Sequence, residues 1–434
     1  MSAAAAASMP AAAAVATSDV PAGGATSDLP AGGHAASVTA PSPAAASTPA
    51  PGASGPTTSR APVVAMVGAG QLARMTQQAA IPLGVHLRVL AGCPDDPAVS
   101  AGAQPLLGSP ERIADLRALA EGARVVTFDH ERIPFEHLDA LAAEGVPLQP
   151  APGAKRLAQD KLQARRTLAS LGFPVPPFAH ATEAAAVAEF AAGHGWPLVA
   201  KAPRGGYDGR GVFWLEDLPA ARRALLEHPG GLLLEPALRL DRELAVLVAR
   251  NRTGEVAVYP VVETVQRSGM CREVHAPARV PSVIARAARD LATGIAERIG
   301  ATGVLAVELF HCAEGLLVNE LALRPHNSGH YTIEGCETSQ FEQHLRAVLD
   351  WPLGAAGLTA PAVATVNVIG PRDGSDPAGR LDRALAVPGC HIHLYGKQPR
   401  PGRKLGHVTV RSGNLDEALD AARSAARVLE GGRP

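Results

Sequence analysis

Aromatic residues are scarce in this sequence of 434 residues. Phe, Trp and Tyr make up 3% of it, whereas there are 44 glycines and 38 prolines. Because so few large side chains are available, we expect part of the chain not to fold. Cysteines are also few: the five are widely spaced, odd in number and form no CxxC pair. This spacing argues against a disulfide framework or a structural zinc site, and for a reducing cytoplasm.

Neither sign of charge is in excess, because 40 lysines and arginines stand against 41 aspartates and glutamates. A chain without a basic surplus has no general attraction for nucleic acid or anionic membrane, so any polyanion must be bound locally. Long apolar runs are absent too, since none approaches the roughly 20 residues that span a bilayer. We therefore expect a soluble, cytoplasmic protein with no nucleic acid or membrane partner and, at this length, two or three domains.

The first 60 residues differ in composition from the rest. Before Arg60 the chain is almost entirely Ala, Pro, Gly, Ser, Thr and Val, with no Lys, Arg, Trp, Tyr or Phe. Such a segment has too little bulky apolar surface to offset the entropy lost on ordering. It also lacks the positive start and apolar core of a signal peptide and the arginines of a transit peptide. We predict a disordered Ala/Pro/Gly-rich tail over residues 1–60.

Strand and helix patterns alternate in the next segment. The predicted elements are a strand at 62–67, a helix at 71–80, a strand at 85–90, a helix from Ser109 to about Glu121 and a strand at 124–129. Ser109 is predicted to be the N-cap of the second helix, with Pro110 as its first residue. Because strands that alternate with helices form parallel sheets, we predict a parallel α/β domain over residues 61–152.

The first turn of this domain, Gly68-Ala69-Gly70-Gln71-Leu72-Ala73, has the glycine spacing of a dinucleotide-binding fingerprint. That fingerprint also needs an acidic residue at the tip of the second strand, where this chain has Val89-Leu90-Ala91-Gly92 and Asp95 comes late. A structural turn, or a helix N-terminus that binds another phosphate, is therefore favoured over a nicotinamide site.

A lysine on a predicted strand precedes a glycine-rich loop. Lys201 lies in the apolar run 197–202, and Gly205-Gly206-Tyr207-Asp208-Gly209-Arg210-Gly211 follows it, before a strand-like run at 212–215. The glycines let the backbone turn its N–H groups onto an anion and leave the loop able to act as a lid. A plain hairpin turn would explain some of the glycines but not the charged side chains. The loop has no Gly-Lys-Ser/Thr of the Walker type, so it indicates a different nucleotide grip.

Two glutamates occupy matched positions in a predicted hairpin. The runs 304–310 and 316–320 flank a turn centred near Glu314, so Glu308 and Glu320 are equidistant from that centre. If the register holds, they face one another across the ladder, and like charges so placed are destabilising. A cation between them would remove the conflict, and Mg²⁺ commonly binds one or two carboxylates plus substrate phosphates. A solvated pair or a slipped register is the alternative.

Two further polar segments follow. Arg324-Pro325-His326-Asn327-Ser328-Gly329-His330 forms a loop directly after the second strand of the hairpin, where active-site chemistry is often found. Around the Pro401-Gly402 turn lie Lys397, Arg400, Arg403, Lys404 and His407. This local cationic patch suits a phosphate monoester, and an exposed basic hairpin is the alternative interpretation.

In their order and spacing, these segments resemble one enzyme family. Lys201 with its glycine loop, Glu308, Asn319-Glu320, the 324–330 loop and the segment 400–407 are similar to N5-carboxyaminoimidazole ribonucleotide synthases of purine biosynthesis, which are biotin-independent ATP-grasp ligases. The resemblance runs from about Val63 to about Val410. It implies an α/β and α+β protein: a preceding parallel α/β domain, an ATP-grasp core over 153–355 with a glycine-loop lid, and a small carboxy-terminal domain over 356–434.

The resemblance also implies a reaction and a site. ATP would phosphorylate bicarbonate, and the carboxyphosphate would carboxylate the amine of 5-aminoimidazole ribonucleotide. Glu308 and Glu320 would hold Mg²⁺, and the protein would be a homodimer. ATP would be bound by Arg156, Lys201, Gly206, Tyr207, Asp208, Gly209, Arg210, Gly211, Val212, Glu235, Pro236, Ala237, Leu238, Glu243, Asn319 and Glu320. Catalysis would involve Tyr207, Asp208, Arg210, Arg324, His326 and Asn327, and the substrate phosphate would meet Gly70, Gln71, Lys397, Arg403 and Lys404.

The sequence departs from the family pattern in two places. Gln266 stands where the family usually has a histidine near the nucleotide, and Leu323 and Pro325 replace the usual neighbours of Arg324.

Two alternative functions stay open: another ATP-grasp ligase, such as a formate-using transformylase or a carboxylase of a different acceptor, and a non-catalytic nucleotide-binding regulator. The paired carboxylates argue against the regulator, because binding alone does not need them.

Overall fold

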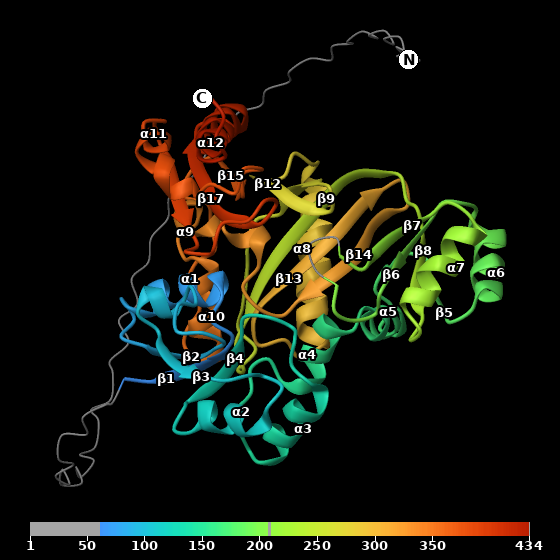
Figure 1. Cartoon of the computed structure of the whole chain (residues 1–434), viewed down its shortest axis with the longest axis horizontal. Coiled ribbons are helices and arrows are strands. Elements are labelled where there is room, and N and C mark those ends of the chain that lie inside the picture. The colour runs from blue at the N-terminus through green and yellow to red at the C-terminus, as the bar shows by residue number, and fades with distance from the viewer. Residues whose placement is uncertain (1–60, 207–209, 434) are drawn as a thin grey trace, which may run out of the picture. The chain divides into compact units, whose positions relative to one another are not determined.

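The computed structural model describes residues 61–206 and 210–433 (Figure 1). The predicted tail over 1–60 and the loop residues Tyr207, Asp208 and Gly209 lie outside these ranges. Among the described helices, none combines the length and the apolar character needed to span a membrane.

The amino-terminal sheet is parallel, as the alternating pattern predicts. Its strands are β1 (Val63–Val67), β2 (His86–Ala91), β3 (Gln104–Leu107) and β4 (Val125–Phe128), in the order β3-β2-β1-β4. Its helices are α1 (Gln71–Ala80), α2 (Ile113–Ala120) and α3 (Phe135–Ala143). Because side chains alternate along β1, Val64 and Met66 join one core, and Ala65 and Val67 join another on the opposite face of the sheet.

Two details of this domain differ from the sequence prediction. Helix α2 begins at Ile113 and not after a Ser109 cap. The Asp115 carboxylate accepts from the Ser109 N–H at 2.8 Å, and Ser109 Oγ accepts from the Glu111 N–H at 3.2 Å, so Ser109 closes a turn ahead of the helix. Strand β3 was not predicted, because it is a short, largely exposed edge strand that contains Pro105.

A second, antiparallel sheet forms the smaller lobe of the middle segment. Its strands are β5 (Ala179–Ala181), β6 (Leu198–Lys201), β7 (Val212–Leu215) and β8 (Leu232–Pro236), in the order β5-β8-β6-β7, with helices α6 (Ala184–His194) and α7 (Leu218–Glu227) (Figure 1). Leu198 and Ala200 are buried in the core of this lobe together with residues of both helices. Since residues alternate between faces along a strand, Lys201 lies on the opposite face of the sheet.

The largest sheet runs through the middle and carboxy-terminal segments in the order β14-β13-β9-β11-β12-β15-β17-β16, with β10 paired to β9. Its strands are β9 (Leu240–Arg250), β10 (Val256–Val258), β11 (Val262–Arg267), β12 (Met270–Ala276), β13 (Gly303–Cys312), β14 (Gly315–Ala322), β15 (Ala362–Ile369), β16 (Cys390–Leu394) and β17 (Lys404–Ser412). Strand β15 pairs with β12, so the carboxy-terminal strands extend the sheet of the core.

The remaining helices join the segments. They are α4 (Pro152–Gln159), α5 (Lys161–Ser170), α8 (Ser282–Arg298), α9 (Thr332–Gly335), α10 (Gln340–Val348), α11 (Leu381–Leu385) and α12 (Leu415–Leu429). Helices α4 and α5 are separate because Asp160 interrupts the run and caps α5 by accepting from the Gln163 N–H at 2.9 Å. Leu345 and Val348 of α10 belong to the same core as Val64 and Met66, so α10 completes the amino-terminal domain.

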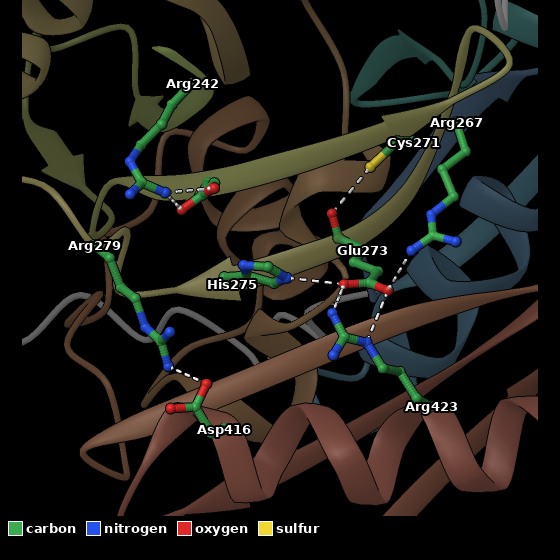
Figure 2. Close-up of polar contacts among 9 residues, drawn as sticks. Arg242, Arg267, Cys271, Glu273, His275, Arg279, Asp416 and Arg423 are labelled. Carbon is green, nitrogen blue, oxygen red and sulfur yellow. Dashed lines mark hydrogen bonds and ion pairs between the residues drawn. The ribbon is translucent and has the colours of Figure 1, made fainter. Parts of the chain in front are cut away.

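Helix α12 is held on the sheet by charged side chains. Arg423 donates to both carboxylate oxygens of Glu273 on β12, at 3.0 and 2.7 Å, and His275 Nε2 lies 3.1 Å from the same carboxylate (Figure 2). Burial alone would raise the pKa of Glu273, but the hydrogen bonds from His275 and Arg423 lower that pKa to about 2. The carboxylate is therefore ionised throughout the neutral range.

Candidate active site

Glu308 and Glu320 face one another across the β13–β14 pair, as predicted. The turn that joins the strands is centred one half-residue earlier than expected, between Ala313 and Glu314, because Cys312 pairs with Gly315. Without a further irregularity Glu308 would then oppose Asn319. A bulge at Asn319 restores the pairing with Glu320, since Leu309 pairs with Val318 and the next pair is Glu308 with Glu320.

The pair of carboxylates suits a divalent cation. Burial, and then the charges of Glu320 and Glu243, raise the pKa of Glu308 to about 7, whereas Lys161 and Lys404 oppose this shift. Lys161 Nζ lies 2.5 Å from Glu320 Oε1 and neutralises one carboxylate directly. The described residues contain no cluster of three or more His, Cys, Asp or Glu side chains placed to hold a metal. Two carboxylate ligands completed by substrate phosphates are the coordination that Mg²⁺ accepts.

Lys201 is held at the centre of a buried polar network. Its Nζ lies 2.7 Å from Glu235 Oε2 and donates to Asn319 Oδ1 at 2.9 Å. Glu235 is also ion-paired with Arg165, which donates to the carbonyl oxygens of Val318 and Asn319. Burial would raise the pKa of Glu235, but Lys201 and Arg165 lower it. The network therefore joins the smaller lobe, through β6 and β8, to the carboxylate hairpin.

The structure does not bring Arg156 to this network. Its guanidinium is ion-paired with Asp139 on α3 and lies over the Phe135 ring, 5.3 Å from the centroid. Lys161, the first residue of α5, reaches the carboxylates instead. Lys161 and Arg165 were not predicted from the sequence. The signal that could have found them is Asp160, a residue typical of an N-cap, which places the next helix so that positions 161 and 165 share one face.

The segment 235–238, which is predicted to bind ATP, links the two lobes. Glu235 and Pro236 end β8, and Ala237 and Leu238 form the connector to β9. The Ala237 N–H already donates to Pro197 O at 3.3 Å, and the Glu235 carboxylate belongs to the lysine network. These groups are engaged within the protein, so an adenine would meet the remaining backbone groups of the connector.

Gln266 lies beside Glu243, which is predicted to bind ATP. Burial raises the pKa of Glu243, and a hydrogen bond with the Gln266 side chain opposes that shift. The departure from the family pattern at Gln266 therefore lies in direct contact with a predicted nucleotide-binding residue.

The described ends of the glycine loop are closely packed. A Cβ on Gly206 would lie 2.6 Å from Arg210 O, so only glycine permits this approach. The Ala202 N–H donates to Gly211 O at 2.7 Å, and Val212 pairs with Lys201 across β6 and β7. Tyr207, Asp208 and Gly209, for which we predicted catalytic and ATP contacts, lie outside the described residues.

The polar loop after β14 places His326 against the carboxylates. His326 Nε2 lies 3.4 Å from Glu308 Oε1, and the ring's Nδ1 receives the Ser328 N–H at 3.3 Å. A backbone N–H can only donate, so this bond fixes the ring proton of a neutral His326 on Nε2, toward Glu308.

Arg324 and Asn327, from the same loop, have partners within the protein. Arg324 Nε lies 2.7 Å from Glu131 Oε1, so the change to Leu323 and Pro325 on either side leaves Arg324 ion-paired with the amino-terminal domain. Asn327 forms a reciprocal amide pair with Asn367 on β15, at 3.0 and 2.8 Å. The side chain of Asn327 is thus held by a carboxy-terminal strand. This amide pair accounts for an asparagine at this position even if Asn327 does not contact the substrate.

The predicted phosphate-binding residues come from distant parts of the chain and lie on elements that pack together. Leu72 and Met75 of α1 belong to the same core as Tyr395, which lies two residues before Lys397. Lys397 Nζ is 5.4 Å from the centre of the Tyr395 ring, beside a cavity of about 240 Å³. Arg403 donates to Gln398 O at 3.0 Å. Gln71, Lys397, Arg403 and Lys404 are therefore brought to neighbouring elements.

The backbone of Gly70, which belongs to the same predicted set, has a partner within the protein. Its N–H donates to Asp129 Oδ2 at 2.8 Å, so that amide is already engaged by a carboxylate. A Cβ on Gly68 would lie 1.8 Å from Asp129 Oδ1, so the glycine turn makes room for this acidic side chain. A carboxylate at this helix end repels a pyrophosphate, which disfavours the dinucleotide alternative and leaves Gln71 as the nearer candidate for a phosphate.

Two lobes meet at the polar network around Lys201, next to the β13–β14 hairpin that bears the paired carboxylates. This arrangement defines an ATP-grasp ligase. Three family models match the chain: a ribonucleotide synthetase preATP-grasp domain over residues 62–159, an ATP-grasp domain over 166–341 and a phosphoribosylaminoimidazole carboxylase C-terminal domain over 364–421. The chain belongs to the N5-carboxyaminoimidazole ribonucleotide synthase family, as its relatives show.

Similar proteins of that name occur in Mycobacterium tuberculosis, at 49% identity over 387 residues that cover 87% of this chain and 90% of that protein, and in Corynebacterium ammoniagenes, at 46% identity covering 85% and 92%. The crystal structure of the Thermus thermophilus synthetase is 38% identical, with a TM-score of 0.77, and covers 86% of this chain and 99% of that one. The Aspergillus clavatus synthase in complex with ADP and 5-aminoimidazole ribonucleotide is 33% identical, with a TM-score of 0.78, and covers 86% and 99%.

Proposed function

We propose that this protein uses ATP and bicarbonate to carboxylate 5-aminoimidazole ribonucleotide, giving N5-carboxyaminoimidazole ribonucleotide in purine biosynthesis. The observation that carries the proposal is the facing pair Glu308 and Glu320, flanked by Lys161 and Lys201, in a chain of this family. Such a set neutralises a nucleotide's phosphates and stabilises a phosphoryl group in transfer. A regulator that only bound nucleotide would have no need of the paired carboxylates.

In the first step a bicarbonate oxygen attacks the γ-phosphorus of ATP, and the bond from phosphorus to the ADP oxygen breaks, giving carboxyphosphate and ADP. Glu308 and Glu320 would hold Mg²⁺, which supplies charge neutralisation and orients the phosphates. Lys201 offers a cation from the smaller lobe and Lys161 one beside the hairpin. No residue has to form a covalent intermediate, because positioning and charge are what the step requires.

In the second step the substrate amine forms a bond to the carboxyl carbon of carboxyphosphate, or to the CO2 that it releases, and phosphate departs. The amine loses one proton, which passes to the leaving phosphate or to solvent. His326 carries its ring proton on Nε2 toward Glu308, so in this arrangement it donates a hydrogen bond and does not accept the proton. Arg403 and Lys404 would bind the substrate phosphate.

The proposal includes a cytoplasmic enzyme, a homodimer, and domains over 61–152, 153–355 and 356–434. The five free cysteines agree with a reducing compartment. The support for a homodimer is the family resemblance, and light scattering on the purified protein tests it directly.

A comparison of bicarbonate with formate tests whether bicarbonate is the substrate that ATP phosphorylates. ADP release is measured with Mg²⁺ and aminoimidazole ribonucleotide, in the presence of bicarbonate or of formate. We expect release to be faster with bicarbonate. Faster release with formate would assign the chain to a transformylase reaction instead.

A further inference from the structure

Gln340, the first residue of α10, holds the backbone of His326 from both sides. Its Oε1 accepts from the His326 N–H at 2.8 Å, and its Nε2 donates to the His326 carbonyl oxygen at 2.8 Å. The second hydrogen of Nε2 points to His330 Nδ1 at 3.2 Å. Gln340 is fully buried.

The partners leave one orientation for this amide. A backbone N–H can only donate and a carbonyl can only accept, so Oε1 must face the first and Nε2 the second. The surroundings make room for it: a Cβ on Gly329 would lie 2.4 Å from Gln340 Oε1. The Gln340 N–H is itself held by Thr332 Oγ1 at 2.8 Å, so the clamp is tied to a fixed helix start.

We propose that Gln340 is a positioning residue for the carboxylation: it acts through His326, fixing the ring at Glu308. The peptide units on both sides of His326 are fixed by Gln340, and the ring is fixed by Ser328, so Nε2 has one place at the carboxylate pair. Loss of the clamp frees the ring to move, and small displacements of aligned groups slow a reaction far more than they weaken binding. The inference rests on the proposed function.

The chain offers a matched control on the same helix. Gln343, one turn further along α10, is also fully buried and clamps Gly354 in the same way. Its Nε2 donates to Gly354 O at 2.6 Å, and its Oε1 accepts from the Gly354 N–H at 2.8 Å. The two glutamines share their burial, their helix and the paired backbone bonds. They differ in what they hold, His326 or Gly354, and in the further contact of Gln340 with His330.

The experiment compares Gln340→Glu and Gln340→Met with Gln343→Glu and Gln343→Met. Glutamate keeps the acceptor but loses the donor, and methionine keeps the length without either group. Saturation curves for ATP and for aminoimidazole ribonucleotide give kcat and both KM values, and thermal unfolding gives Tm. Where a glutamate variant does not fold, the uncharged methionine variant supplies the comparison.

We expect Gln340 variants to lose about 10- to 100-fold in kcat relative to the Gln343 variants, at similar Tm and with the KM for ATP nearly unchanged. An equal loss in both sets, or wild-type kcat in a folded Gln340 variant, overturns the proposal.

A nitrogen NMR spectrum of the His326 ring detects a change in the position of the ring without measuring the reaction. We expect the ring nitrogen shifts of His326 to be the same in the wild-type protein and the Gln343 variants, and to change in the Gln340 variants only, because only these free the ring to move. An unchanged His326 spectrum in the Gln340 variants contradicts the positioning role. A wild-type protein whose ATP turnover does not respond to aminoimidazole ribonucleotide contradicts instead the proposed function.

Discussion

Glu308 and Glu320 lie opposite one another although like charges repel, and Lys161 is ion-paired with Glu320 alone. We expect Glu320→Gln to reduce Mg²⁺-dependent ATP turnover at least about 100-fold, because a metal that stabilises the transferring phosphoryl group contributes several kcal/mol. The fold should survive, since the substitution removes a repulsion and keeps the shape. Initial rates against Mg²⁺ concentration measure the effect.

Glu314→Gln is the matched control for this substitution. Glu314 lies in the turn of the same hairpin and is exposed, so its variant should retain wild-type turnover. Undiminished activity of Glu320→Gln at ordinary Mg²⁺ concentrations would contradict a metal-binding role for the pair.

Arg403 is predicted to recognise the substrate phosphate and not ATP. It belongs to the segment around Lys397 and Lys404, which lies far along the chain from Lys201. Replacing Arg403 with Ala should raise the KM for the ribonucleotide about 10- to 150-fold, the equivalent of a lost charged hydrogen bond of roughly 1.5–3 kcal/mol. The KM for ATP should stay nearly unchanged, because binding that is equal in the ground and transition states acts on KM first.

Saturation curves for ATP and for the ribonucleotide, both measured on the Arg403→Ala variant, show which of the two substrates Arg403 binds. The exposed Arg372, also in the carboxy-terminal segment, provides an Arg→Ala control. A shift of the ATP curve without a shift of the ribonucleotide curve would place Arg403 in the nucleotide site.

Single residues were predicted best where local pattern sets their position. Strand alternation and spacing predicted the pairing of Glu308 with Glu320, which the bulge at Asn319 preserves although the turn centre is displaced. They were not enough to choose between Arg156 and Lys161, because the choice depends on a helix break at Asp160 and on a partner 159 positions away. Likewise, nothing near Asn327 in the sequence indicates its amide pair with Asn367 on a strand of the carboxy-terminal segment.

At the scale of elements, buried strands and helices with clear periodicity were predictable. Strand β6 and helix α1 lie where the sequence places them. The bulge at Asn319 and the late start of α2 were not predictable, since each depends on side-chain contacts that form only in the folded protein. The predicted pairing of Glu308 was correct even though the turn centre was displaced, because the bulge cancels the displacement.

The contacts of Glu273 with Arg423 and His275, which attach α12 to β12, make the free energy of unfolding depend on pH. The pKa of Glu273 is lowered to about 2, whereas a glutamate in an unfolded chain has a pKa of roughly 4.3. The contribution of Glu273 to the free energy of unfolding is therefore present at pH values above the unfolded pKa, and it is lost as the pH falls toward 2. We expect Glu273→Gln to lower the free energy of unfolding by up to about 3 kcal/mol at pH 7. The difference from wild type should shrink between about pH 5 and pH 2.

Urea unfolding of both proteins over this pH range measures the effect, with the exposed Glu216→Gln as the control. A difference from wild type that is the same at pH 7 and pH 3 would show that the bonds of Glu273 to Arg423 and His275 do not depend on its charge.

At the scale of the whole described molecule, the segments matched by the three family models are joined by shared structure. The sheet of the core continues into the carboxy-terminal strands through β12 and β15, and α10 completes the core of the amino-terminal domain. Arg324 adds an ion pair with Glu131 across the first two segments. Composition and motifs gave the order of the segments but not these junctions, because each joins positions far apart in the sequence.

The central claim is that bicarbonate carbon is transferred to the amine of aminoimidazole ribonucleotide at the expense of ATP. The most direct test is carbon NMR of a reaction with ¹³C-bicarbonate, ATP, Mg²⁺ and the ribonucleotide, with ADP measured in the same sample. We expect a labelled carbamate carbon to form in step with ADP, and neither to form at a comparable rate without the ribonucleotide. ADP release with no labelled carbamate, or a carbamate that forms equally fast without ATP, would contradict the account.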